Sequence, residues 1–330
     1  MRRKVGIAAL GAVLLWSSHI SAQGLPLRNV TFIPQWIPQA QFAGYFVALD
    51  KGFYEKQGLN IKILRGGPDH PSSRALEQGD ADFATMFLST AIQKRSRGLK
   101  VVNIAQIVQK SALMLVARKS SGIQSPEDIN GKKVSVWSGD FQLQPAAFFR
   151  KYNLDVTVIP QSSTLNLFLR GGVDVASAMW YNEYHTILSS GLDPEDLTTF
   201  LLADFGINFP EDGIYCMEAT WESDPETCCR FVRASIEGWL YAFTHPGESM
   251  DIVMRYVKEA MTPTNRMHQK WMLERMKDLI LPPGLNPDSV GRLRPEDYEP
   301  VVQEMSRHGA IQDPPDYAEF ARDCAIHVQP

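Results

Sequence analysis

Four aromatic residues each follow a stretch that is typical of a β-strand. They are Trp36, Phe87, Trp137 and Trp180. In an open α/β sheet, ligands bind in the crevice beyond the carboxyl ends of the strands. Aromatic faces at such positions suit a flat solute, which binds best to apolar surfaces with a few well-placed hydrogen bonds. One such residue alone could pack at a domain edge, but four at equivalent positions favour a ligand-binding cleft.

The segment after Trp180 supplies the clearest polar partners for such a solute. Glu183 can accept two hydrogen bonds from an amino-substituted ring, and the neighbouring Asn182 offers both a donor and an acceptor. Gln39 lies in the loop after the first expected strand, near Trp36. Glu183 also has a second interpretation, as a solvated residue in the first turn of a helix, where the helix dipole favours a carboxylate. Both interpretations stay open on the sequence.

Two glycine-containing loops could bring backbone N–H groups to an anionic or carbonyl group of the solute. Gly66 and Gly67 belong to the first loop, and Gly139 belongs to the second. Neither loop is a phosphate-binding motif, since the patterns GxxxxGK[ST] and GxGxxG do not occur in the chain. Ordinary turn chemistry explains both loops equally well. Asp212, followed by Gly213, is likewise either a hinge-turn residue or a ligand contact.

The sequence lacks the patterns of common catalytic and metal sites. It contains no GxSxG motif, and its seven histidines are scattered. No CxxC pair occurs, so a zinc site is disfavoured. The formal net charge of -4, without a long basic block, argues against a nucleic-acid surface. We therefore expect no catalytic residue, no metal, no cofactor and no nucleic-acid partner.

The N-terminus has the composition of a secretory signal peptide. Arg2, Arg3 and Lys4 precede an apolar stretch over residues 5–16, and residues 20–22 supply a small-residue cleavage context. The apolar stretch is shorter than the roughly 20 residues that a membrane span requires. We expect residues 1–22 to be removed and the mature protein to be located in the periplasm.

The four cysteines fit an oxidising compartment, where disulfides persist. They are Cys216, Cys228, Cys229 and Cys324. Four cysteines allow three full connectivities, and the sequence does not choose among them. Because adjacent cysteines seldom bond each other, we expect a longer-range bridge.

Strand and helix patterns alternate over residues 30–203, which indicates parallel α/β sheets covered by helices. The segments GDADFA at 79–84 and GGVDVA at 171–176 share a Gly-x-small-Asp-apolar-Ala pattern, as two lobes of similar wiring would produce. We expect residues 24–118 to form the first part of lobe 1 and residues 119–212 to form lobe 2. The apolar strands 111–118 and 212–217 are our candidates for the two hinge crossings.

The C-terminal part of the chain, residues 213–330, is expected to return to lobe 1. Its patterns predict amphipathic helices over 224–243, from Pro246 onward, over 264–279 and over 295–307. Helix stops are expected at Gly79, Gly98 and Gly171, and a helix start is expected at Ser125.

Several motifs occur in a characteristic order over residues 30–281: WIPQAQFAGYF, GGPD, GDADF, GKKVSVWSGDF, YNEY and PEDGIY. In these motifs the chain resembles the thiamine-pyrimidine group of periplasmic substrate-binding proteins. The resemblance implies an α/β, type II periplasmic binding protein fold with two lobes joined by a two-strand hinge. It also implies that Trp36 stacks on a pyrimidine and that Asn182 and Glu183 read its amino edge. Gly66, Gly67, Trp137, Gly139 and Asp212 match motif positions.

By this resemblance, the protein is expected to be a monomeric receptor for a small aromatic solute such as formylaminopyrimidine. Its partners would be an ABC permease and its ATPase in the inner membrane. Other proteins of this kind carry sulfonates, nitrate, riboflavin or other aromatic compounds, so fold alone does not choose the ligand. A sensory module that docks onto the ectodomain of a membrane receptor shares the fold and is a third possible function.

The same superfamily includes fungal pyrimidine synthases, which makes an enzyme the alternative function. Those enzymes consume one of their own histidines and use pyridoxal phosphate bound to a lysine. The synthase pattern would require Lys in place of Met86 and His in place of Thr90. Both are missing, so the sequence favours a binding protein over an enzyme.

Overall fold

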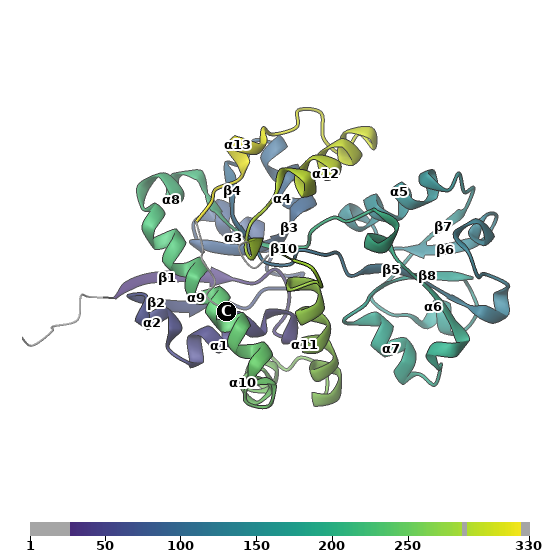
Figure 1. Ribbon diagram of the computed structural model, residues 1–330, viewed down its shortest axis with the longest axis horizontal. Helices are drawn as coiled ribbons and strands as arrows, with labels where there is room; N and C mark the ends of the chain where they lie inside the picture. Colours follow the sequence, from purple (N-terminus) through teal and green to yellow (C-terminus); the bar gives the residue numbers. More distant parts are fainter. Residues whose placement is uncertain (1–26, 286–288, 325–330) are drawn as a thin grey trace, which may run out of the picture.

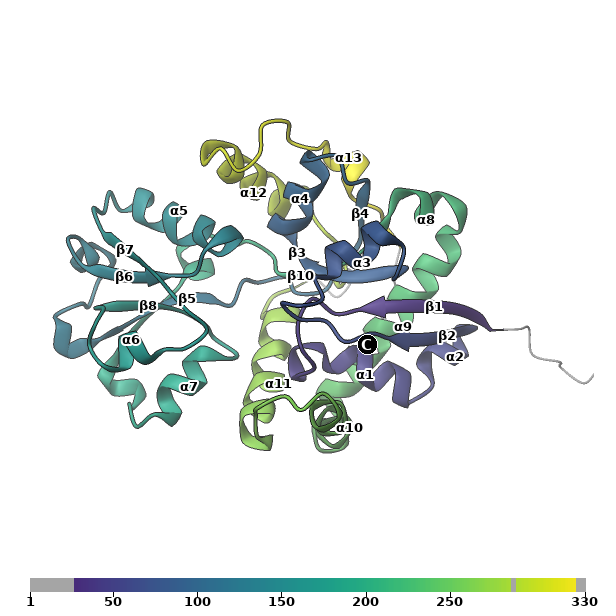
Figure 2. The same cartoon turned by 180° about the vertical axis from the view of Figure 1, so that it is seen from behind.

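The computed structural model describes residues 27–285 and 289–324. This part of the chain forms two lobes, each built on a five-stranded sheet, and two extended segments link them (Figures 1 and 2). The architecture confirms the expected two-lobed α/β fold. The predicted signal peptide, residues 1–22, lies outside the described residues. Among the residues described, no helix has the length and apolar character needed to cross a membrane.

Lobe 1 contains the sheet with strand order β2-β1-β3-β10-β4. Its strands are β2 (Leu59–Ile63), β1 (Arg28–Ile33), β3 (Phe83–Phe87), β10 (Asp212–Met217) and β4 (Val101–Gln106). Strand β1 is parallel to β2 and β3, whereas β10 is antiparallel to both β3 and β4. All of β4 and nearly all of β10 is buried, as expected for strands covered on both faces.

Lobe 2 repeats this wiring in the order β7-β6-β8-β5-β9. Its strands are β7 (Thr157–Pro160), β6 (Lys133–Val136), β8 (Val175–Met179), β5 (Leu113–Arg118) and β9 (Leu197–Leu201). Strand β6 is parallel to β7 and β8, and β5 is antiparallel to β8 and β9. In each sheet, the antiparallel strand is the one that the chain enters on arriving from the other lobe.

Two expectations about the sheets are wrong. The sheets are mixed, not parallel. The chain arriving from the other lobe enters each sheet at the end where the parallel strands finish, so its first strand there, β10 or β5, is antiparallel to them. The candidate hinge crossings 111–118 and 212–217 are mostly sheet strands, β5 and β10, and their apolar character reflects burial between neighbouring strands. The segments that link the lobes are residues 107–112, here called the first crossing, and residues 206–211, the second crossing.

The internal repeat corresponds to the same local structure in both lobes. The Asp82 Oδ2 atom accepts a hydrogen bond of 2.8 Å from the backbone N–H of Thr31 in β1. The Asp174 Oδ2 atom accepts one of 2.8 Å from the backbone N–H of Lys133 at the start of β6. Each aspartate thus joins the turn before β3 or β8 to the neighbouring parallel strand.

Short helices cover the sheets in the first two thirds of the chain. In lobe 1 these are α1 (Ala43–Asp50), α2 (Phe53–Lys56), α3 (Ser72–Gln78) and α4 (Leu88–Ser96). In lobe 2 they are α5 (Leu143–Lys151), α6 (Asn166–Leu169) and α7 (Glu183–Ser189). The 3-10 turns are η1 (Ala40–Phe42), η2 (Lys119–Ser121), η3 (Pro126–Ile129), η4 (Gly139–Gln142), η5 (Pro194–Asp196) and η6 (Leu202–Phe205). The expected glycine helix stops are confirmed at Gly79, Gly98 and Gly171, which all have positive φ. The start at Ser125 produces only the 3-10 turn η3.

The C-terminal helices return to lobe 1, as predicted. They are α8 (Glu218–Ser223), α9 (Pro225–Thr244), α10 (Pro246–Glu259), α11 (Arg266–Ile280), α12 (Pro295–Arg307) and α13 (Tyr317–Phe320). Helix α9 crosses α1 at a point where neither backbone has a side chain. A Cβ on Gly238 would overlap the carbonyl oxygen of Gly44, so glycine allows this close approach.

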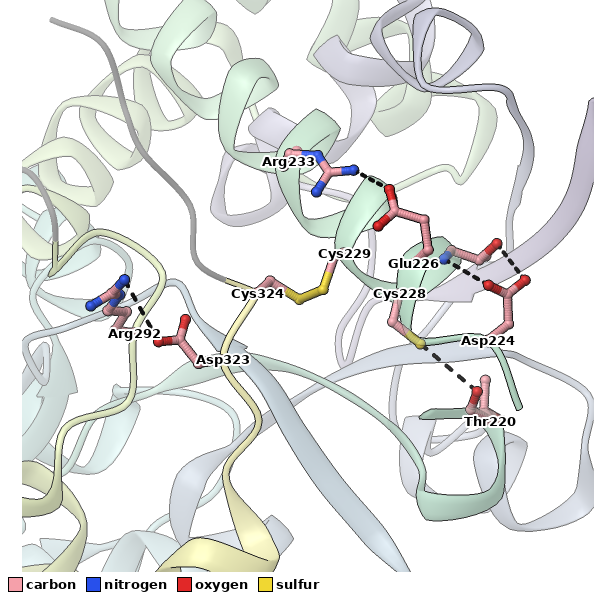
Figure 3. The surroundings of a disulfide bond; sticks show 10 residues. Thr220, Asp224, Glu226, Cys228, Cys229, Arg233, Arg292, Asp323 and Cys324 are labelled. Carbon is pink, nitrogen blue, oxygen red and sulfur yellow. Dashed lines mark hydrogen bonds and ion pairs between the residues drawn. A yellow bond between two sulfur atoms is a disulfide. The ribbon is translucent and has the colours of Figure 1, made fainter. Parts of the chain in front are cut away.

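The core of lobe 1 centres on aromatic residues that α9 brings to the sheet. The Phe231 ring lies 4.5 Å from Phe83 and 5.3 Å from Tyr54, measured between centroids, and is stacked on both. The neighbouring Cys229 forms a disulfide with Cys324, which ties α9 to the C-terminal segment (Figure 3). The expected long-range bridge is therefore confirmed. Cys216 and Cys228 are buried free thiols.

Candidate functional site

A small cavity lies between the lobes, beside the second crossing. Its lining residues are Phe87 and Ser89 of lobe 1, Leu113, Phe141, Gln144 and Met179 of lobe 2, and Phe209, Pro210 and Glu211 of the second crossing. The cavity volume is about 20 Å³. A cavity of this size holds about one water molecule. A solute with an aromatic ring therefore needs the lobes to separate before it can enter.

Aromatic side chains from both lobes meet at this cavity. Phe87, the last residue of β3, makes an edge contact with Phe141 of lobe 2 at a centroid distance of 5.3 Å. Phe141 also contacts Trp137, which follows β6, at 5.6 Å. Gly139 begins η4 with φ of 73°, and this turn carries the chain from Trp137 to Phe141. The structure thus brings Phe87 and Trp137 together through Phe141, which was not among the predicted site residues.

A cluster of glutamine side chains surrounds the Asp212 carboxylate in lobe 1. Asp212 is 2% exposed and accepts hydrogen bonds from the Nε2 atoms of Gln35 and Gln41, the latter at 2.7 Å. The Gln39 Nε2 atom donates to Gln41 Oε1 at 2.6 Å. Burial raises the pKa of Asp212 to about 7, because the interior disfavours the charged form, although the bond from Gln41 opposes this shift. Gln39 and Asp212 are therefore parts of one buried polar cluster.

Glu211, the neighbour of Asp212, connects the two crossings. Its Oε1 atom accepts a hydrogen bond of 2.5 Å from the backbone N–H of Ala112 and lies 3.1 Å from the Ser111 hydroxyl. That hydroxyl also lies 3.1 Å from Gln144 Oε1 on α5. Burial, with a smaller contribution from the Asp212 charge, raises the pKa of Glu211 to about 8. A glutamate that also lines the cavity therefore fastens one crossing to the other.

The loop that carries Trp36 lies outside the set of cavity-lining residues. Trp36 follows β1 and is 43% exposed. A Cβ on Gly66 would overlap the carbonyl oxygen of Pro34, and Gly67 has φ of 135°. The two glycines therefore allow their loop to approach the backbone of the Trp36 loop closely. They are close to Trp36, but whether this group binds a solute stays a prediction.

Asn182 and Glu183 lie at the start of α7 and bond locally. The Glu183 Oε2 atom accepts a hydrogen bond of 3.0 Å from the backbone N–H of Met179, and Oε1 accepts one of 2.8 Å from Asn182 Nδ2. Burial is the main cause that raises the pKa of Glu183. Both carboxylate oxygens thus have partners at the helix start, where the second interpretation placed Glu183, but the side chain is half-buried rather than solvated. The role of the pair in reading a ligand stays a prediction.

Trp180 takes part in a contact between the lobes. Its carbonyl oxygen accepts a hydrogen bond of 3.0 Å from Trp271 Nε1 on α11. The Arg275 guanidinium lies 4.8 Å from the ring centroids of both Trp180 and Trp271. Beside them, the imidazole rings of His185 on α7 and His268 on α11 are 4.7 Å apart. We call this group the α7–α11 contact.

A second contact between the lobes connects α5 with α12. Arg150 of lobe 2 forms an ion pair with Glu304, which is 5% exposed. Helices α11 and α12 lie on opposite sides of the two crossings (Figures 1 and 2). Lobe 2 is therefore held against lobe 1 on both sides of the crossings.

Known proteins resemble this chain in sequence and in fold. The family described as NMT1/THI5 like matches residues 39–249. The chain belongs to this family. The riboflavin-binding protein RibY of Chloroflexus aurantiacus is 26% identical to this NMT1/THI5-like chain over 248 residues, which cover 71% of this chain and 68% of that protein. The formylaminopyrimidine-binding protein of Halalkalibacterium halodurans is 21% identical over 324 residues, covering 93% and 94%.

Solved structures support the fold assignment of this NMT1/THI5-like protein. The periplasmic aliphatic sulphonate binding protein SsuA from Escherichia coli has a TM-score of 0.70, with 89% of this chain and 91% of that protein covered. The sequence identity is 14%, so this likeness concerns the fold. The two lobes thus have the arrangement of a periplasmic binding protein.

Several residues around the cavity were missed from the sequence. Phe141 and Glu211 were seen only as neighbours of Gly139 and Asp212, and Gln144 has no local pattern that marks it. A signal did exist for Glu211: two adjacent carboxylates stand between the apolar segments INFP and GIYC, which predicts that acids are buried there. Buried acids at the start of a strand are uncommon and indicate a functional site.

Proposed function

We propose that this protein is a solute-binding receptor that captures a small aromatic heterocycle between its lobes. A thiamine pyrimidine precursor such as formylaminopyrimidine is the solute that we favour. The observation that carries the proposal is the cavity between the lobes, where aromatic rings from both lobes and a buried carboxyl group converge. A flat ring with N–H groups matches such a lining, because it offers two apolar faces and a polar edge.

The charges around the cavity favour a neutral ring over an anion. The ionisable group in the lining is Glu211, and Asp212 is adjacent to it in the chain. The lining of this described cavity includes no lysine or arginine. A sulfonate or nitrate would lose its hydration without gaining a cation, which is costly. Riboflavin, a neutral flavin ring system, is the main alternative ligand.

Binding is proposed to occur by closure of the lobes about the two crossings. Such hinge closure around ligands is a common device. The small cavity volume and the contacts on both sides of the crossings support this proposal, since they describe lobes that are already close together. The closed receptor would act as a monomer in the periplasm and deliver its solute to an ABC permease and its ATPase.

A thermal unfolding panel with the mature protein tests the proposal. The panel contains formylaminopyrimidine, riboflavin, an alkanesulfonate and nitrate. A solute at 100 times its dissociation constant should stabilise the protein by about 2.7 kcal/mol. We expect the pyrimidine to give this shift and the two anions to give none. A shift with the alkanesulfonate alone, or with no solute, would contradict the proposal.

Variants can then separate the cavity residues from the Trp36 loop. Phe141→Ala removes a ring that lines the cavity, and Trp36→Ala removes the ring predicted from the family motif. Loss of a stacking face costs about 1 to 3 kcal/mol of binding free energy. Trp221→Ala, on α8, is the matched control and should leave affinity unchanged. Calorimetry in which only Trp36→Ala weakens binding would place the solute outside the present cavity.

Pyrimidine synthesis is the alternative function, and one structural observation weighs against it. Met86 occupies the position where the synthase pattern requires lysine, and it is a 1% exposed residue of β3. Thr90, on α4, occupies the position where the pattern requires histidine. Incubation with pyridoxal phosphate followed by borohydride reduction checks this directly. A reduced adduct on this chain would favour the enzyme, whereas recovery of unchanged solute after denaturation favours the receptor.

A further inference from the structure

Glu211 is unusual among the acids of this protein in its surroundings. It is 4% exposed, lines the interlobe cavity and lies in one of the two segments that link the lobes. Both of its hydrogen bonds to the first crossing involve Oε1, from the Ala112 N–H and the Ser111 hydroxyl. The carboxyl group is therefore held in place from one side while its side chain borders the space between the lobes.

The ionisable groups that face Glu211 do not neutralise a charge on it. Asp212, the next residue, is a buried acid, and Tyr181 at the end of β8 has its pKa raised by burial and by Glu211, Asp212 and Glu183. Gln144 of α5 and Ser89 of α4 are neutral. Lys110, a cation in the first crossing, pairs instead with Asp204 at 2.6 Å. A proton on Glu211 is therefore the least costly way to keep this acid buried.

We propose that Glu211 is a specificity-determining residue that binds the solute as a neutral carboxylic acid. Its O–H, on Oε2, donates to a ring nitrogen or carbonyl oxygen of the solute, while Oε1 keeps its hydrogen bonds from Ser111 and Ala112. The matching solute is an uncharged heterocycle with a hydrogen-bond acceptor at its edge, such as a pyrimidine ring nitrogen. Solute binding then requires that one proton be bound to the protein. This inference rests on the proposed receptor function.

The proposal gives solute binding a characteristic dependence on pH. The pKa of Glu211 is about 8 in the unliganded protein. Below this value the acid is already neutral, so affinity should be constant. Above it each binding event must first protonate the carboxylate, so the dissociation constant should rise about tenfold per pH unit. An anionic Glu211 that bound the solute as a pure acceptor would give the opposite trend, with affinity lost as pH falls.

The test is calorimetry from pH 6.5 to 9.5 with formylaminopyrimidine, or with riboflavin where that is the solute that wild type binds. For the wild type we expect constant affinity to about pH 8 and a loss of about tenfold per unit above it. Repeating the titration at pH 9 in two buffers of different ionisation enthalpy should show uptake of close to one proton per solute. Glu211→Gln keeps a permanent donor and acceptor, so it should still bind, with a flat profile and no proton uptake.

Two further variants separate this role from a structural one. Ser111→Ala removes a hydrogen bond that favours the carboxylate, so the inflection should move to higher pH. Asp297→Asn, a change of another buried acid with a raised pKa, lies on α12 away from the lining and should keep the wild-type profile.

Three outcomes would overturn the inference while leaving the receptor proposal in place. They are a flat wild-type profile, an inflection that persists in Glu211→Gln, and an inflection that Asp212→Asn abolishes instead. If no solute binds at any pH, the receptor proposal itself fails, and the inference fails with it.

Discussion

Lobe 1 and lobe 2 have equivalent strand orders and directions, but lobe 1 has more elements that stabilise its sheet. Each sheet has one strand, β1 or β6, between two parallel neighbours, and one antiparallel strand that the chain enters from the other lobe. Lobe 1 adds the helices α8 to α13 and the disulfide, whereas lobe 2 has three helices, α5 to α7, in its described residues. Lobe 1 is therefore the more heavily reinforced of the two lobes.

The two lobes also differ in what they bring to the interlobe region. Aromatic residues follow equivalent strands in both, since Trp36 and Phe87 follow β1 and end β3, while Trp137 and Trp180 follow β6 and β8. The buried glutamine cluster around Asp212, in contrast, belongs to lobe 1. Equivalent topology thus places rings on both sides, and sequence differences make one side more polar.

Removing the disulfide should produce the largest difference between the lobes. The Cys229–Cys324 bond closes a loop of 95 residues within lobe 1. Loop-closure entropy for this length is worth about 4.7 kcal/mol. We expect the Cys229→Ser/Cys324→Ser double variant to lose up to about this much stability. Hydrogen exchange read by mass spectrometry should show the loss of protection in lobe 1.

Reducing agent provides the control, because it should destabilise the wild type and leave the double variant unchanged. Equal loss of protection in the strands of lobe 2 would mean that the lobes unfold as one unit. The disulfide would then not stabilise lobe 1 selectively.

The glycine crossing of α1 and α9 should give the next largest effect. Gly238→Ala places a methyl group where the Gly44 carbonyl oxygen and the Ala48 side chain already lie. Overpacking of this kind costs about 1 to 3 kcal/mol. Gly247→Ala on α10 is the matched control, because nothing lies within 4 Å of its added Cβ. Urea unfolding should show a clear loss for Gly238→Ala alone, and similar midpoints for both variants would contradict the crossing as described.

The repeated aspartates allow a smaller and more direct comparison of the lobes. Asp82→Ala and Asp174→Ala each remove one hydrogen bond to a strand backbone N–H, both of 2.8 Å. The bond of Asp82 is partly buried, whereas that of Asp174 is exposed. We expect a cost of about 1 kcal/mol or more for Asp82→Ala and less for Asp174→Ala, because solvent replaces an exposed bond more easily. Denaturant titrations measure the loss of stability in each variant. A larger loss for Asp174→Ala than for Asp82→Ala would contradict the expected order.

The α7–α11 contact should give the smallest effect, a dependence of lobe closure on pH. Burial, and then the nearby His185, lowers the pKa of His268 to about 4. Separated lobes would return this histidine toward its ordinary value of about 6.5. The open form therefore binds more protons between these values, and closure should weaken as pH falls from about 6.5 to about 4.

Small-angle X-ray scattering can follow this change as an increase in the radius of gyration on acidification. The His185→Gln/His268→Gln double variant is the control and should have a smaller increase. An equal response in both proteins would assign the acid sensitivity to groups outside the α7–α11 contact.

The sequence alone predicted the two-lobed α/β fold, the C-terminal helices and the repeat that relates the lobes. These features depend on local signals: apolar periodicity, helix-stopping glycines and an aspartate that bonds a neighbouring strand. The positions of Trp36, Phe87, Trp137 and Trp180 at strand ends follow for the same reason, since a strand of known direction has only one carboxyl end.

Only the tertiary structure decided which segments cross between the lobes, which cysteines pair and which acids are buried. Strands β5 and β10 look like any apolar strand in the sequence, and their antiparallel pairing depends on partners far away in the chain, as with Asp212 opposite Phe87. Glu211 likewise has a raised pKa because it is buried between the lobes, and the hydrogen bonds from Ser111 and Ala112 oppose this shift. Burial is a property of the assembled lobes, so no local pattern could assign that glutamate its environment.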